Sequence, residues 1–297
     1  MQKAITRLGL VWMALLSVAP LGVIQAQNVS LLTPLVADVL NAPQAVLGSD
    51  GDQHLVYEVR VENLTDGRFT LKQITVTDAS GIELAQLDAQ AIRGRFSLGG
   101  RRGSETDVLG PFQFGVAFLH VSISASRPVP TSLTHVVRGY SEKVAAEFSM
   151  PLASTPVSTA SPVALSAPLR GTGYVAADGC CDSIRHVRAL LPLGGRFALA
   201  QRFAIDWEKV DDHGRIFVGD SKAVSSYRIY GDPVYAVADG TVVASRSDLD
   251  DQIPGKLPEG LDLDEADGNF VIMQLRPGIY ALYAHMKKGS SSLSTGA

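Results

Sequence analysis

Alternation of apolar and polar residues predicts β-strands in the first half of the chain. Between His54 and Asn63 the apolar side chains fall on one face and charged side chains on the other, with the period of two that a half-buried strand requires. The pair Asp66-Gly67 has the backbone freedom of a hairpin turn, and a second alternating run, Phe69–Thr77, follows it. The long apolar run Phe112–Ala125 is expected to be a central strand. About seven such runs at this spacing predict an immunoglobulin-like sandwich over residues 27–150.

Three histidines of this region stand apart in the sequence, each in or beside a predicted strand: His54, His120 and His135. An isolated histidine in such a position is more often packed or solvated than a ligand, so we expect no metal role for them. The edges of the domain could bind a partner by strand addition, or the domain could serve only to space or shield the rest of the chain.

The start of the chain has the features of a secretory signal peptide. Lys3 and Arg7 precede an apolar run from Leu8 to Val23, and Ala26 is a small residue at a cleavage position. An uncleaved membrane anchor is the alternative, because about 20 apolar residues can span a bilayer. We assign residues 1–26 to export and expect the protein in the periplasm or outside the cell, with membrane contact only through an uncleaved segment.

The composition of the chain indicates a second domain and argues against one class of function. From Pro151 to Pro168 the chain turns to Pro, Ser, Thr and Ala without a charged residue, which is typical of a linker, so residues 169–297 are expected to form a second domain. Fifteen prolines and 28 glycines accord with an all-β chain rich in turns. The net charge is −4 and the basic residues are scattered, which argues against a nucleic-acid-binding protein.

The only two cysteines of the chain, Cys180 and Cys181, are adjacent. In an oxidising compartment they could form a disulfide between neighbours, pair with another chain, or stay as two buried thiols. Zinc binding by this pair is disfavoured, because structural zinc sites leave at least two residues between their cysteines.

Four short sequence motifs, called phrases here, follow one another in a specific order in the second domain. The first, Gln201–Trp207, is an apolar strand that ends near an aspartate, and the second, Tyr230–Val243, is a hairpin with the pattern Pro-Val-x-Ala-x-x-Asp-Gly-x-Val. The third, Gly268–Ile272, is a strand with the pattern Gly-Asn-x-Val, and the fourth, Tyr280–His285, ends in Tyr-Ala-His. In this order they resemble the lysostaphin-like (LytM-like) zinc metallopeptidases of metallopeptidase family 23, which have the duplicated hybrid motif fold. The resemblance implies an antiparallel β-sandwich and a zinc endopeptidase that cuts peptide cross-links in peptidoglycan.

The resemblance also implies the site residues. Asp206 corresponds to a zinc ligand, and His285 corresponds to the catalytic histidine that lines the cleft. The family's other ligand histidine, four residues before the aspartate, is Arg202 here; a guanidinium has no lone pair for zinc, and a salt bridge with Asp206 is expected instead. A hairpin through Gly194-Gly195 would place His186 opposite a residue near Arg202, across strands about 4.8 Å apart, so we expect His186 as the replacement ligand.

The family continues to a His-x-His pair, and the chain reaches Ala297 before such a pair occurs. We therefore expect an incomplete sandwich of the peptidase type, at most two zinc ligands, and no hydrolysis of peptidoglycan by the chain as it stands. The alternative function is that of a non-catalytic wall-binding or hydrolase-regulating homologue. In either case the expected partner is peptidoglycan or a protein of the cell envelope.

Overall fold

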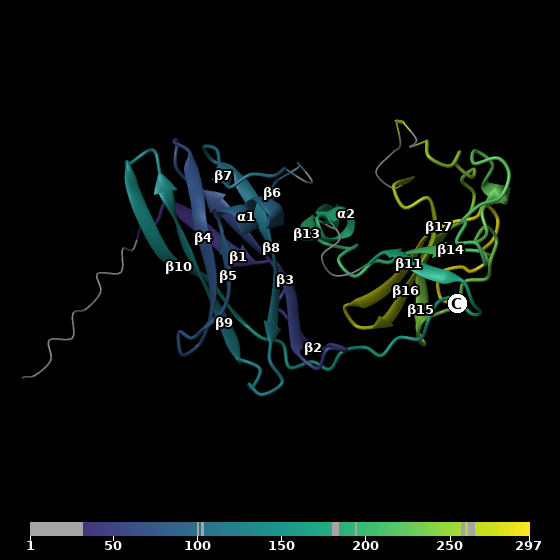
Figure 1. Ribbon diagram of the computed structural model, residues 1–297, viewed down its shortest axis with the longest axis horizontal. Coiled ribbons are helices and arrows are strands. Elements are labelled where there is room, and N and C mark those ends of the chain that lie inside the picture. The colour runs from purple at the N-terminus through teal and green to yellow at the C-terminus, as the bar shows by residue number, and fades with distance from the viewer. Residues whose placement is uncertain are drawn as a thin grey trace, which may run out of the picture. The chain divides into compact units, whose positions relative to one another are not determined.

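The computed structural model describes residues 32–99, 101, 104–179, 184–193, 195–256, 259–260 and 265–297 (Figure 1). The expected signal segment, 1–26, and the pair Cys180-Cys181 lie outside the described residues. Residues 34–297 form one compact unit. Within the described ranges, no helix has the length and apolar character needed to span a bilayer.

Two five-stranded antiparallel sheets make up the first half of the described chain. The first sheet has the order β1 (Leu35–Val39), β3 (Gln53–Asn63), β8 (Phe114–Ile123), β6 (Phe96–Leu98), and β2 (Ala45–Leu47) also pairs with β3. The second has the order β10 (Ala146–Pro156), β9 (Ser132–Ser141), β4 (Phe69–Asp78), β5 (Glu83–Asp88), and β7 (Val108–Leu109) also pairs with β4. The short helix α1 (Ala89–Arg95) joins β5 to β6, and Asp88 caps it by accepting the Ala91 N–H.

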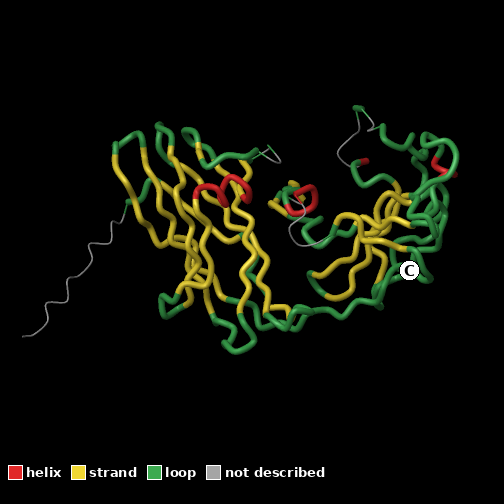
Figure 2. Tube along the Cα trace, viewed as in Figure 1, coloured by secondary structure: helices red, strands yellow, loops and turns green. Residues whose placement is uncertain are grey.

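One apolar core lies between these two sheets. The inward side chains of β3 are fully buried, as the alternation predicts, and they pack with inward residues of β4, β8 and β9 in a single cluster; those of β3 are Leu55, Tyr57, Val59 and Val61. Strands and loops dominate the part of the chain that the structure describes, and its helices are short (Figure 2). The all-β class and a sandwich in the first half are thereby confirmed.

The expected linker begins later than predicted. Strand β10 runs through Pro151 to Pro156, so six residues of the expected linker belong to the sandwich, and the irregular segment starts at Val157. Proline is tolerated here because β10 is an edge strand, where a missing N–H need not leave a partner unpaired.

The three histidines are not isolated, which corrects the expectation from the sequence. The His54 Nδ1 atom lies 2.9 Å from the His120 Nε2 atom, because the pairing of β3 with β8 puts both side chains on the outer face of one sheet. The buried His135 ring contacts the Tyr57 hydroxyl at 2.8 Å. Sequence separation hid both contacts.

The described residues of the second half form three small antiparallel sheets. They pair β11 (Tyr174–Asp178) with β14 (Asp206–Lys209), β12 (Leu191–Leu193) with β13 (Arg196–Ala198), and β15 (Thr241–Arg246) with β16 (Asn269–Arg276), which also pairs with β17 (Ile279–Met286). Helix α2 (Ile184–Val187) and the 3₁₀ turn Val224–Ser226 are the other elements among the described residues of this half.

The predicted hairpin at Asp239-Gly240 is absent, because residues 232–240 form no strand before β15. Side-chain and loop partners satisfy this backbone instead: the Val237 N–H donates to the Tyr283 hydroxyl and the Tyr235 N–H donates to the Pro168 carbonyl, both at 2.8 Å. The phrase is therefore anchored to β17 and to the irregular segment rather than to a neighbouring strand of its own.

Candidate metal centre

Two carboxylates meet at the end of the β11–β14 sheet. The strands pair antiparallel, and a register shift between Ala176 and Asp178 sets Asp178 opposite Asp206. Like charges directly opposite each other in a sheet repel, so a cation beside this pair would reduce the repulsion.

Helix α2 brings an imidazole to the same place. The His186 Nε2 atom lies 3.2 Å from Oδ1 of Asp206, and the histidine side chain is 10% exposed. One ligand atom each from Asp178, His186 and Asp206 lies within 4.8 Å of the other two, and in the part of the chain that the structure describes no other three His, Cys, Asp or Glu side chains come together in this way. Carboxylate oxygen and imidazole nitrogen are both ligands that Zn²⁺ accepts.

Arg185 supplies positive charge to the two carboxylates. Its Nη2 atom lies 2.5 Å from Oδ2 of Asp178 and 3.4 Å from Oδ2 of Asp206. The Arg185 side chain is 71% exposed, so solvent screens this contact and the guanidinium can turn outward. A divalent cation and the guanidinium would therefore compete for the same oxygens.

The chemistry of this donor set fits a divalent cation. Two carboxylates carry two negative charges, and a neutral imidazole adds a nitrogen lone pair. The buried Nδ1 atom of His186 has no hydrogen-bond partner among the described residues, whereas a metal-binding histidine usually donates its other ring N–H to an acceptor. The three side chains match an ion in type, and the 3.2 Å between the His186 Nε2 atom and Oδ1 of Asp206 suits two ligands of one ion. The ring orientation of His186 depends on packing.

His186 contacts Asp206 as predicted, but from a helical turn and not from the predicted hairpin strand. The expected hairpin is confined to β12 and β13, and His186 lies on α2 instead of a strand. Four consecutive buried residues, 186–189, cannot belong to a half-exposed strand. Val187 packs with Leu199 against residues of β8, and this burial favours the helical turn.

Arg202 pairs with Glu58 and not with Asp206, so the predicted salt bridge is wrong. Its Nε and Nη2 atoms donate to the two carboxylate oxygens of Glu58, which lies on β3 with a side chain only 1% exposed. A buried carboxylate loses more hydration than the half-exposed Asp206, so it has the greater need of a cation. Burial raises the pKa of Glu58, and the charge of Arg202 opposes that rise.

His285 lies outside the three-residue group. It is an exposed residue of β17 with a φ of +56°, and its backbone N–H donates to the Asp267 carbonyl at 3.0 Å. An added Cβ on Gly268 would come within 3.6 Å of its Nδ1 atom, so the imidazole lies beside this glycine. The structure thus brings together the two predicted ligands and leaves the predicted catalytic histidine apart from them.

Asp178 is the site residue that sequence reasoning missed. It ends an apolar strand and precedes a glycine, which is an ordinary arrangement. Its meeting with Asp206 depends on the register of β11 against β14, which no local pattern reports. With Asp178, the group has three candidate ligands instead of the expected two.

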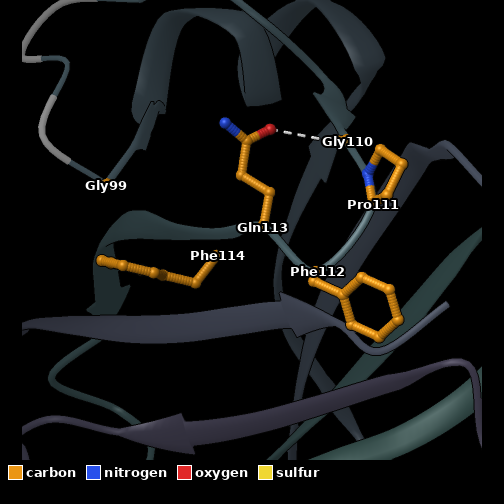
Figure 3. Close-up of a pocket in the computed structure, with 6 residues that line it drawn as sticks. All are labelled: Gly99, Gly110, Pro111, Phe112, Gln113 and Phe114. Atoms are coloured by element: carbon orange, nitrogen blue, oxygen red, sulfur yellow. Dashed lines mark hydrogen bonds between the residues drawn. The ribbon is translucent and has the colours of Figure 1, made fainter. Parts of the chain in front are cut away.

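A hollow of about 500 Å³ lies on the sandwich, where the chain passes from β7 to β8 (Figure 3). It is lined by Gly99, Gly110, Pro111, Phe112, Gln113 and Phe114. The Gly110 N–H donates to the Gln113 side-chain oxygen at 2.8 Å, and none of the lining side chains is titratable. This hollow offers no acid, base or metal ligand.

No family model matches the chain, and no curated protein matches it. Weak likenesses exist among solved structures: a Northeast Structural Genomics Consortium target, SoR45, has 16% identity and a TM-score of 0.29 over 43% of this chain and 88% of its own. The putative ApaA protein from Bordetella pertussis has 13% identity and a TM-score of 0.28, and the match covers 42% of this chain and 95% of that protein. A FixG-related protein from Vibrio parahaemolyticus has 10% identity and a TM-score of 0.25, and the match covers 42% of this chain and 98% of that protein. Likenesses this low assign the chain to no family.

Proposed function

We propose that this chain is a zinc metalloendopeptidase-like protein that acts on the peptide cross-links of peptidoglycan, with zinc held by Asp178, His186 and Asp206. The observation that carries the proposal is the convergence of these three side chains from β11, α2 and β14. The substrate class comes from the resemblance of the four phrases to lysostaphin-like peptidases, in which Asp206 corresponds to a ligand.

Each residue of the group has a defined task in this proposal. Asp178 and Asp206 provide oxygen ligands and the negative charge that holds a cation, and His186 provides a nitrogen ligand through Nε2. Bound zinc supplies Lewis acidity toward a peptide carbonyl. Arg185 compensates part of the charge of the two carboxylates until the ion arrives and then turns into solvent. The resemblance assigns His285, which lies outside the ligand group, the exchange of a proton with the substrate at a ring nitrogen.

The test is a hydrolysis assay on purified peptidoglycan with the full chain, with and without added zinc. The sequence-based expectation of no hydrolysis assumed at most two zinc ligands; with Asp178 as a third, we expect zinc-dependent appearance of new amino groups, with loss of that signal in Asp206→Asn and His186→Gln. His213→Gln is the matched control, because His213 is exposed and lies outside the group. Stoichiometric zinc binding without any release of amino groups would contradict the peptidase reading.

A non-catalytic wall-binding or hydrolase-regulating role is the second candidate, and the position of Arg185 favours it. Because the guanidinium contacts both carboxylates, part of their negative charge is compensated without a metal. Such a protein would sediment with peptidoglycan equally well in the presence of zinc and of a chelator, and it would release no amino groups.

A further inference from the structure

Side chains of types that can bind a metal also lie close together on the outer face of the first sandwich sheet. Side chains alternate along β3 and β8, so that residues such as Leu55 and Val121 enter the core while their neighbours face outward. The register sets His54 opposite Ser122 and Val56 opposite His120. Two imidazoles and a hydroxyl therefore share one face of two adjacent strands.

The nitrogen and oxygen atoms of this set converge. Nδ1 of His54 lies 2.9 Å from Nε2 of His120 and 3.1 Å from Oγ of Ser122. The two rings have their centroids 5.1 Å apart and are tilted by 53°. Zn–N bonds of about 2.0–2.1 Å in a tetrahedral site place two nitrogens roughly 3.3 Å apart. A widening of a few tenths of an ångström, with both rings turned so that their lone pairs meet beside the line between the nitrogens, would admit an ion.

Asp50 fixes which nitrogen of His54 faces His120. Its two carboxylate oxygens lie 3.0 and 3.1 Å from Nε2 of His54. An ionised carboxylate only accepts hydrogen bonds, so Nε2 carries the proton and a neutral His54 directs the lone pair of Nδ1 toward His120. A carboxylate behind a histidine is the arrangement that orients metal-binding imidazoles in proteins.

The turn between β2 and β3 holds this carboxylate in place. The Asp52 N–H donates to Oδ1 of Asp50 at 3.1 Å. A Cβ added to Gly48 would meet both Oδ1 of Asp50 and Nε2 of His54 at 2.5 Å, so only glycine fits against the pair. The orientation of His54 is thus fixed by a tight turn next to a sheet.

We propose that His54 Nδ1 and His120 Nε2 bind a divalent late transition metal, Cu²⁺ more tightly than Zn²⁺, with the Ser122 hydroxyl beside the ion. Imidazole nitrogens suit these metals, and the order of affinities for a given site peaks at Cu²⁺. A hydrogen bond between the two rings satisfies the same atoms when no ion is bound. The proposal uses no residue of the Asp178–His186–Asp206 group and does not depend on it.

The test is Cu²⁺ titration of the full chain carrying His186→Gln, with binding measured by calorimetry and the ligands of the ion identified by electron paramagnetic resonance. One bound ion with two nitrogen ligands is expected. Adding His120→Gln or His54→Gln should abolish that binding, and adding His213→Gln should leave it unchanged. Asp50→Asn, which keeps the size of the side chain, should weaken Cu²⁺ affinity about 10-fold or more.

Thermal unfolding of each variant separates loss of a ligand from loss of the fold. Equal binding and equal nitrogen coordination in the His120→Gln protein, with its fold intact, would overturn the proposal. So would the absence of a bound ion in the parent chain at micromolar Cu²⁺.

Discussion

Replacement of Arg202 by methionine should destabilise the protein strongly, because it leaves the Glu58 carboxylate buried without its cation. The Glu58 and Arg202 side chains are 1% and 13% exposed, so solvent cannot replace the lost partner. Removing one member of a buried ion pair costs about 3–5 kcal/mol of the free energy of unfolding. Urea titration at neutral pH measures this loss directly.

The loss should depend on pH in a defined direction. Burial already raises the pKa of Glu58 above its unfolded value, and removing Arg202 raises it further. When the pKa of a group is raised in the folded state, its contribution to the free energy of unfolding is complete below the unfolded pKa, about 4.3 here. That contribution disappears as the pH rises through the folded pKa. The Arg202→Met protein should therefore differ little from the parent near pH 4 and differ most at pH 7 and above.

Two further variants complete this experiment. Glu58→Gln combined with Arg202→Met removes both charges and should recover most of the stability. Arg185→Met removes an arginine that is 71% exposed and should change the free energy of unfolding little. A loss below about 1 kcal/mol for Arg202→Met, or the same loss at pH 4 and pH 7, would refute the reasoning.

Three other predictions concern separate parts of the chain. Arg185→Gln should tighten Zn²⁺ binding severalfold in calorimetry, because the guanidinium contacts both carboxylates of the metal group; unchanged affinity would show that it does not compete. Burial lowers the pKa of His135, so stability should fall as the pH drops below the unfolded value of about 6.5, and His135→Gln should flatten that slope in urea titrations. Gly139→Ala should lower the melting temperature, because a Cβ would meet the Thr70 carbonyl at 2.3 Å and the Phe69 ring at 2.4 Å; an unchanged melting temperature would contradict this packing.

Local patterns predicted what depends on local geometry. The alternation along β3 identified side chains that are fully buried, such as Leu55 and Val59, because the period of two is a property of a single strand. The start of the linker was misplaced because Pro151 and Pro156 are typical both of linkers and of edge strands.

The candidate site was predictable only in part, because its members meet through pairing between distant segments. Asp206 and His186 were expected together, but through a hairpin that burial on the sandwich replaces with the α2 turn. Asp178 depends on the register shift in β11, and the partner of Arg202 is Glu58, 144 positions away in the sequence. These contacts are set by tertiary packing, which the sequence pattern of each segment does not contain.

Zinc titration of the full chain, combined with X-ray absorption at the zinc edge, tests the central claim most directly. In a protein carrying His120→Gln, which removes the second proposed metal site, the claim predicts one zinc ion with nitrogen and oxygen ligands, and this ion is lost when Asp178→Asn, His186→Gln or Asp206→Asn is added. Zinc binding that survives all three of the latter substitutions, or no stoichiometric binding by the parent protein, would contradict it.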